Sequence, residues 1–272
     1  MSKKQIINRQ QSIISKFFNY IGKKIIQAVS QIGGFFETTF KILGYFPSIF
    51  KNRKLIIEQM AIVGADSLPL VLLIGSFTGA IAALQATALF DKFGLMDLAK
   101  PFLGASIATA VFQELTPVLT ALVIAGRVGG SMAAQIGTMV VTEQVDALEL
   151  MAIDKNRFLG MPRVVAAFLM MPLLAVFSST IALLGAYVMV MAKFDITSAF
   201  YFGSIKDFFK FSELIVCLGK SALFGLTTAI VGVYIGFSTI NGAEGVGHST
   251  VRAFTISASL ILILDAIWGY LF

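Results

Sequence analysis

Five long apolar stretches, separated by short polar breaks, constrain the fold of this 272-residue chain more than any other feature. The hydrocarbon core of a bilayer is about 30 Å thick, so a helix needs roughly 20 apolar residues to cross it. Each stretch has about that length, and none shows the alternating pattern of an outer-membrane barrel. The sequence therefore predicts an all-α integral membrane protein with about five transmembrane helices, near Ser67–Leu89, Phe102–Ala125, Val164–Met191, Leu214–Phe237 and Phe254–Phe272.

The overall composition excludes a soluble globular protein of this size. Hydrophobic residues make up 57% of the chain and charged residues only 13%, and the mean hydropathy is +0.86. A soluble protein needs far more polar surface than this. The single cysteine, Cys217, lies in an apolar stretch, which excludes an internal disulfide.

The distribution of Lys and Arg predicts the orientation in the membrane, because basic residues gather in cytoplasmic loops. If the N-terminus is cytoplasmic, 15 of the 21 basic residues fall on the cytoplasmic side and five fall outside, while Lys220 lies within a span. We therefore expect a cytoplasmic N-terminus and an outer C-terminus.

The sequence divides into a basic amphipathic region at residues 1–60 and a membrane-spanning domain at residues 61–272. Apolar residues recur at helical spacing over residues 6–32, and most lysines there fall on the other side of the helix. Such a helix lies in the membrane interface, where anionic lipid attracts it. The segment Gly33–Phe50 carries charges and a proline, so we interpret it as interfacial or re-entrant.

Three ionisable residues, Glu114, Lys220 and Asp265, stand within the predicted spans. A charge near the bilayer centre costs roughly 2.5–3.5 kcal/mol, so each should face the bundle interior or a wet cavity. Counted from the outer end of its own span at 1.5 Å per residue, Glu114 lies roughly 18 Å deep, and the other two lie roughly 9–11 Å deep. We therefore expect Lys220 to pair with Asp265, and Glu114 to lie deeper without an obvious partner of opposite charge. Alternatives stay open: Lys220 and Asp265 form a pair that serves packing alone or snorkel outward, and Glu114 is a protonated, hydrogen-bonded carboxyl.

Prolines and glycines predict how the spans bend and pack. A proline within a span removes a backbone hydrogen bond, which neighbouring groups must replace. Glycines four residues apart allow two helix backbones to approach closely. The prolines are Pro69, Pro117 and Pro172, and the glycine pairs are Gly75 with Gly79, Gly126 with Gly130, and Gly232 with Gly236.

No catalytic or metal-binding motif emerges from the sequence. Gly219-Lys220-Ser221 ends like a phosphate-binding loop, but Leu214 stands where that motif needs glycine, and no strand precedes it. His248 is the only histidine and has no array of cysteines or carboxylates around it, so we expect it in a loop rather than at a metal. We predict no enzyme activity, no metal site and no nucleic-acid partner.

The middle of the chain resembles a known family. QELTPVLTALVIAGRVGG, IGTMVVTEQVDALELMAID and the following PRVVA are similar to the signature of the MlaE-type permeases, the membrane subunits of ABC transporters that move lipids with MCE-domain proteins. The resemblance extends from about Glu58 to Phe272 and includes EQMAIVG, GKS and GAEGVGHST. It departs at Gln113, where some members carry Arg, and at Gln135, where Glu is common.

This resemblance implies a homodimer with a lipid cavity between the two permeases. It implies two cytosolic ABC ATPase subunits, which would bind ATP and Mg²⁺, and a ring of MCE-domain lipid-binding proteins on the outer side. This chain itself would hold no cofactor. The membrane would be the bacterial inner membrane, or the inner envelope if the source is a plastid.

The resemblance also assigns roles to residues. The lipid pathway would include Glu114, Lys220 and Asp265. Helical spacing adds Val118 and Leu122 to this predicted pathway, because they lie one and two turns along from Glu114 on the same face. A short coupling helix near residues 138–152 would dock on the ATPase. The residues that match its pattern are Glu143, Gln144, Ala147, Leu148, Glu149 and Met151, and we include Asp146, which lies among them, in the predicted coupling set.

The sequence therefore favours the permease subunit of an ABC transporter for phospholipid or a related lipid, powered by a separate ATPase. The chief alternative is an ion- or proton-coupled secondary transporter that uses Glu114 as a relay. The chain lacks the internal repeat that many such transporters show. A membrane scaffold that transports nothing would explain the apolar spans but not the charges within them.

Overall fold

The structure is a computed structural model, and all the regular secondary structure of its described part is helical, which confirms the predicted fold class. It describes the backbone of residues 3–194 and 197–271, and the side chains of residues 22–26, 29–95, 98–193 and 197–271. Five segments of this part are long and apolar enough to cross a membrane. They are Arg53–Lys92, Lys100–Val141, Asn156–Lys193, Phe211–Phe237 and Gly242–Leu271.

Each predicted span corresponds to one of these segments, but several segments extend beyond the apolar core. The last begins at Gly242, twelve residues before the predicted start, because a run of small and polar residues continues the helix past its apolar part. His248 therefore lies within this helix, and its expected place in a loop was wrong.

The first two spans are interrupted helices. Gly64 ends α2 (Arg53–Val63), and a 3₁₀ turn (η2, Ala65–Ser67) leads into α3 (Leu68–Lys92). The second span contains two π-helical turns, in which an extra residue is accommodated in the helix. Its pieces are η3 (Lys100–Phe102), α5 (Leu103–Ala110), the π-turn η4 (Val111–Leu115), α6 (Thr116–Ile124), the π-turn η5 (Ala125–Gly129) and α7 (Gly130–Val141).

The last three spans are more regular. Pro172 lies within α9, which continues on both sides of it. The remaining elements are the short α4 (Met96–Ala99) and α8 (Gln144–Leu150), the π-turn η6 (Asn156–Gly160), α9 (Met161–Phe194), α10 (Ser198–Phe208), α11 (Phe211–Phe237) and α12 (Gly242–Leu271).

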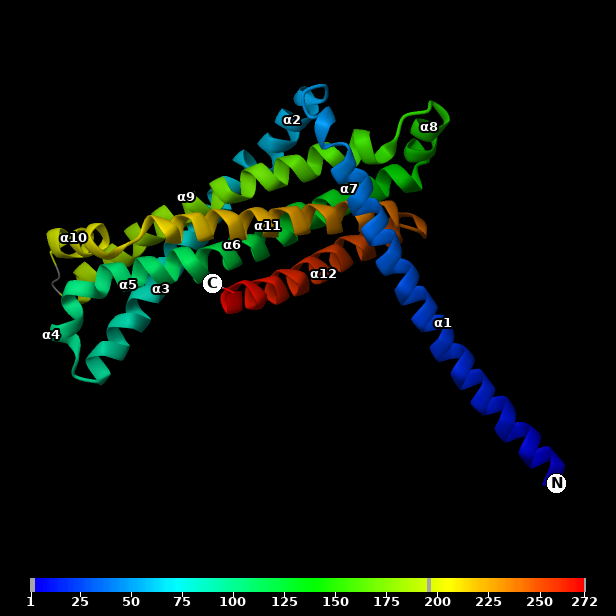
Figure 1. Ribbon diagram of the computed structural model, residues 1–272, viewed down its shortest axis with the longest axis horizontal. Helices are drawn as coiled ribbons and strands as arrows, with labels where there is room; N and C mark the ends of the chain where they lie inside the picture. Colours follow the sequence, from blue (N-terminus) through cyan, green and yellow to red (C-terminus); the bar gives the residue numbers. More distant parts are fainter. Residues whose placement is uncertain (1–2, 195–196, 272) are drawn as a thin grey trace.

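The N-terminal region is one long helix, α1 (Lys3–Gly44), followed by a 3₁₀ turn (η1, Phe46–Ser48). Figure 1 shows α1 leaving the bundle obliquely, with its N-terminus far from the other helices. Its last turns pack on the bundle, where Ile42 is completely buried. The helix continues unbroken through Gly33 and Gly34, so this segment is not re-entrant up to Gly44, and its interfacial position stays a prediction.

Small residues hold the helices together, as the glycine spacing predicted. A Cβ atom added to Gly79 of α3 would collide with the backbone of Ala182 in α9, so these two helices touch backbone to backbone. Gly232 and Gly236 of α11 lie in the same way against residues of η5 and α7, and a Cβ at Gly126 would touch Phe254 of α12. The bundle is therefore packed through close approaches within the chain.

The two ends of the bundle differ (Figure 1). One end carries α4 and α10, and the other carries α8, the start of α12 and the last turns of α1. The C-terminus lies part-way along the bundle, so α12 stops well short of the end that carries α10. With the predicted orientation, the end with α8 is the cytoplasmic one.

Candidate functional site

Lys220 of α11 lies between two carboxylates inside the bundle, and we call Glu114, Lys220 and Asp265 the charged triad. The Nζ atom of Lys220 donates a hydrogen bond to Oε2 of Glu114, at 2.9 Å, and lies 2.7 Å from Oδ1 of Asp265. The lysine is completely buried, so the two acids replace the water that its charge has lost. The predicted pair of Lys220 and Asp265 is confirmed.

The prediction that Glu114 lacks a partner was wrong. It rested on counting depth from the outer end of each residue's own span, but the spans do not end at one level. Because α12 stops part-way along the bundle (Figure 1), Asp265 lies deeper than its distance from the C-terminus suggests. All three residues of the triad are therefore within reach of one another.

Pro117 explains a third contact of the lysine. A proline has no backbone N–H, so the carbonyl four residues earlier, that of Gln113, loses its α-helical donor. The Nζ atom of Lys220 donates to this oxygen at 2.9 Å. The same turn is the π-turn η4, in which the hydroxyl of Thr116 donates to the carbonyl of Val111. The irregular backbone of the second span is thus part of the site, as π-turns often are.

The triad is open on one side only. The side chain of Glu114 is 52% exposed and that of Asp265 is 21% exposed, whereas Lys220 has no exposed surface. Val118 and Leu122 follow Glu114 at four-residue intervals on the same face and are half-buried. The site therefore exposes the carboxylate of Glu114, which pairs with the buried Lys220. Apolar side chains follow Glu114 along the same face of the helix.

The predicted coupling helix is α8, a two-turn helix at the end of the bundle opposite α10 (Figure 1). It is held to the bundle by Val145, which is buried. The other side chains of the predicted set face outward, apart from the half-buried Leu148: Glu143, Gln144, Asp146, Ala147, Glu149 and Met151 are exposed. Glu143 lies just before the helix with a positive φ of 60°, so it closes the turn from α7.

The tip of α8 is apolar and unusually exposed. Leu150 is 90% exposed and Met151 is 62% exposed. Glu149, by contrast, pairs with Lys155 at 2.9 Å. Leu150 and Met151 therefore form an exposed apolar tip at this end of the bundle.

The end of α1 contacts the segment that follows α8. The hydroxyl of Tyr45 donates to Oδ2 of Asp154 at 3.0 Å, and this hydrogen bond raises the pKa of Tyr45. Asp154 also accepts from the backbone N–H groups of Asn156 and Arg157, which begin the next span. The N-terminal helix is thus connected to the loop between the second and third spans.

Comparison with known proteins identifies the family. The sequence model of the family described as Permease MlaE matches residues 56–271. This chain belongs to the MlaE permease family. It is 37% identical over 257 residues to a "Probable ABC transporter permease protein" of Rickettsia bellii, which covers 93% of this chain and 96% of the relative. Two further relatives are also named as probable ABC transporter permease proteins. The one from Synechocystis is 37% identical, and the match covers 81% of this chain and 82% of the relative. The one from Pyropia yezoensis is 33% identical, and the match covers 85% of this chain and 86% of the relative.

The chain is therefore a multi-pass membrane protein of an ABC transporter permease family. Where it departs from the MlaE pattern, the structure shows what the two glutamines do. The backbone carbonyl of Gln113 accepts a hydrogen bond from Nζ of Lys220. The side-chain oxygen of Gln135 accepts one from Nη2 of the buried Arg163, at 3.3 Å. Arg163 also donates to the carbonyl of Leu159.

Two polar contacts of this MlaE permease could not be found from the sequence. The hydroxyl of Thr109 donates to Glu213, a nearly buried acid at the start of α11, at 2.8 Å. Arg127, in the π-turn η5, donates to the hydroxyl of Ser67. The only sequence signal for these contacts was the charge of Glu213 and of Arg127, each close to apolar residues. No three His, Cys, Asp or Glu side chains form a metal-binding group in the part of the chain that the structure describes.

Proposed function

We propose that this chain is the membrane subunit of an ABC transporter that moves phospholipid, or a related lipid, and that a separate ATPase supplies the energy. The observation that carries the proposal is the charged triad, in which a fully buried Lys220 supports the half-exposed carboxylate of Glu114. Because a charge in the membrane is costly, such a group is retained where it meets water or a polar ligand. Glu114 would meet the headgroup, and the apolar strip with Val118 and Leu122 would accept acyl chains.

The exposure of α12 supports a homodimer with a cavity between its two copies. Among the five candidate spans, α12 is the least buried within the chain. Its exposed apolar side chains, such as Leu262 and Ile267, leave a face for a second copy beside Glu114 and Asp265. A twofold arrangement would place two triads around one central space.

The exposed tip of α8 supports a cytosolic ATPase as partner. Leu150 and Met151 would insert into a groove of that subunit, and Glu143 and Asp146 would meet basic residues at its rim. Motion of the ATPase would then reach α7 and α9 through the short loops on each side of α8. ATP and Mg²⁺ would bind to that partner only.

The outer partner in this proposal is an MCE-domain lipid-binding protein. It would receive or deliver lipid at the end of the bundle that carries α4 and α10. The membrane would be the bacterial inner membrane or the plastid inner envelope, with the basic helix α1 on its cytoplasmic or stromal surface.

Reconstituted transport tests this function. The chain and its ATPase would be placed in liposomes with a fluorescent phospholipid, and ATP-dependent lipid movement would be measured. We expect movement with the wild type, a fall of at least tenfold with Glu114→Gln, and normal rates with Glu58→Gln, an acid outside the triad.

Two outcomes would overturn the proposal. The first is that the assembled, ATP-hydrolysing complex moves no lipid. The second is that the chain alone, without an ATPase, dissipates a proton gradient in a manner that needs Glu114, which would establish the secondary-transporter alternative.

A further inference from the structure

Two cavities meet where α11 gives way to α12, far from the charged triad along α11 and α12. The first has a volume of about 560 Å³ and is lined mainly by polar side chains of α1, the end of α11 and the start of α12. The second, of about 380 Å³, is lined almost wholly by apolar side chains of the same three helices. They share Gln31, Tyr234 and Arg252, so they form one amphipathic cavity. Both volumes lie within the range of about 300–1,000 Å³ that is typical of ligand sites.

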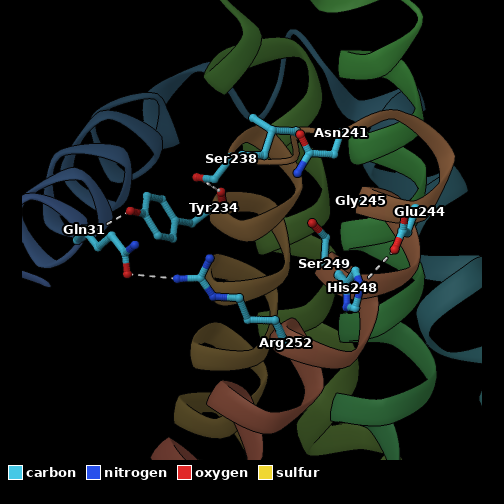
Figure 2. A pocket seen from close by; sticks show the side chains of 10 residues that line it. Gln31, Tyr234, Ser238, Asn241, Glu244, Gly245, His248, Ser249 and Arg252 are labelled. Carbon is cyan, nitrogen blue, oxygen red and sulfur yellow. Dashed lines mark hydrogen bonds and ion pairs between the residues drawn. The ribbon is translucent and has the colours of Figure 1, made fainter. Parts of the chain in front are cut away.

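The shared wall is held together by hydrogen bonds from Tyr234 and Arg252 to α1 (Figure 2). The Tyr234 hydroxyl donates to the backbone carbonyl of Gln31 at 2.8 Å. The Arg252 Nη2 atom donates to the side-chain oxygen of the same glutamine at 2.9 Å. A guanidinium has five N–H donors in a planar fork that suits phosphate, and the contact with Gln31 uses one of them.

Charges and apolar groups follow one another along a single face of α12. Glu244, His248 and Arg252 are spaced at four-residue intervals from the start of the helix, and Figure 2 shows them along one side of the polar cavity. Ile256 and Leu260 continue the same face into the apolar cavity. From the end of the bundle inward, the cavity therefore offers the Glu244 carboxylate, the His248 imidazole 3.8 Å from it, the Arg252 guanidinium and then hydrocarbon.

We propose that this cavity binds one phospholipid of the cytoplasmic leaflet, with an amine-bearing headgroup. The phosphate accepts hydrogen bonds from Arg252, the ammonium group lies toward Glu244, and one acyl chain lies in the apolar cavity beside Phe36. This order of groups matches a phospholipid, in which the phosphate lies between the amine and the acyl chains. Glu244 disfavours a headgroup of net negative charge, because two negative groups would then share the mouth of the cavity.

The dimensions agree with this ligand. Eight residues separate Arg252 from Leu260, which is about 12 Å along a helix. Half of the hydrocarbon core is about 15 Å thick, so the apolar cavity spans most of one leaflet. The lipid would lie between α1 and the bundle and would bind both, since Gln31 and Phe36 belong to α1.

Site-specific photo-crosslinking tests the proposal. The full chain, with p-benzoylphenylalanine in place of Phe36, would be placed in nanodiscs containing equal amounts of phosphatidylethanolamine and phosphatidylglycerol. After irradiation, mass spectrometry would identify the product. We expect phosphatidylethanolamine to be captured in excess. Arg252→Gln should lower its capture about tenfold, because a charged contact to the phosphate is lost.

The matched control is Arg53→Gln, an exposed arginine at the start of α2 that lines neither cavity. It should leave capture unchanged, whereas Glu244→Gln should reduce the preference for phosphatidylethanolamine. Three results would each overturn the proposal: capture that does not depend on Arg252, capture of phosphatidylglycerol alone, and capture of a second copy of this chain. Added inorganic phosphate should not displace the lipid, and displacement at millimolar concentration would identify an anion site instead.

Discussion

At the scale of single residues, the charged triad balances one buried cation against two acids. Lys220 has no exposed surface, and its Nζ atom contacts Glu114, Asp265 and the carbonyl of Gln113. Each partner offsets part of the cost of removing the ammonium group from water. We therefore expect the three side chains to act as one unit, so that replacing any one of them alone lowers the stability of the protein.

Lys220→Met should lower the free energy of unfolding by about 3 kcal/mol, because it leaves two carboxylates close together without their cation. The triple variant Lys220→Met, Glu114→Gln and Asp265→Asn should recover most of this loss, since no uncompensated charge remains. Denaturant titration in detergent would measure both. If the triple variant were no more stable than the single one, the three side chains would not act as a unit.

Pro117→Ala tests the role of the freed carbonyl. The new N–H at position 117 can bond to the Gln113 carbonyl, which would then compete with Lys220 for that oxygen. We expect little change in stability but a fall of several-fold in lipid-stimulated ATP hydrolysis by the complex. Pro69→Ala, at the start of α3, is the control and should leave hydrolysis unchanged. If both variants hydrolysed ATP at the same rate, the contact between Lys220 and the Gln113 carbonyl would not be needed for function.

Sequence reasoning identified the three charges but misjudged their geometry. The cost of a charge in the membrane marks Glu114, Lys220 and Asp265 without any structure. Their grouping depends on where each helix ends, and the sequence does not reveal that α12 stops part-way along the bundle. Pro117 did contain a usable signal, because a missing donor predicts that another group must satisfy Gln113.

At the scale of helices, close backbone contacts determine the packing, as the glycine spacing predicted. Alanine normally stabilises a helix by up to about 1 kcal/mol relative to glycine. At Gly79 the added methyl group would collide with the backbone of Ala182, so Gly79→Ala should instead destabilise the protein by about 2 kcal/mol. Gly247→Ala is the control, because nothing lies within 4 Å of its added Cβ atom. Thermal unfolding would measure both, and equal effects would contradict the α3–α9 contact.

The tip of α8 gives a second prediction at this scale. Leu150→Glu with Met151→Glu should abolish co-purification of the ATPase while the permease stays folded, because the exposed apolar contact is lost. Leu95→Glu, on an exposed leucine at the other end of the bundle, is the control. Retention of the ATPase by the double variant would exclude docking through this tip. Charge reversal at Glu149 would be less clear, since that side chain already pairs with Lys155.

The spans themselves could be predicted because membrane thickness sets their length, but their irregular turns could not. The π-turns η4 and η5 come with tertiary contacts, such as that of Arg127 with Ser67. The length of an apolar stretch does not predict such contacts. The length of α12 was underestimated for a similar reason. Its first three turns consist mainly of small and polar residues, which apolar length does not mark as part of a span.

At the scale of the whole molecule, the bundle carries the exposed tip of α8 at one end and the charged triad further along its length. The two are connected through α7, the last piece of the second span, which leads to α8. The triad lies on the second, fourth and last spans. No catalytic group is needed for this arrangement to work as a transporter subunit. In the function that we propose, the face formed by Glu114, Val118 and Leu122 meets lipid that moves when ATP is hydrolysed.

Photo-crosslinking at position 118 in the assembled complex tests that claim most directly. A probe in place of Val118 leaves the triad intact, and a probe in place of Leu184 on α9, 46% exposed, reports the lipid that surrounds any membrane protein. We predict that phospholipid is captured at position 118 at rest and that this capture changes at least threefold during ATP hydrolysis, while capture at position 184 stays constant. Capture of protein alone at position 118, or equal lipid capture at both positions with and without ATP, would contradict the account.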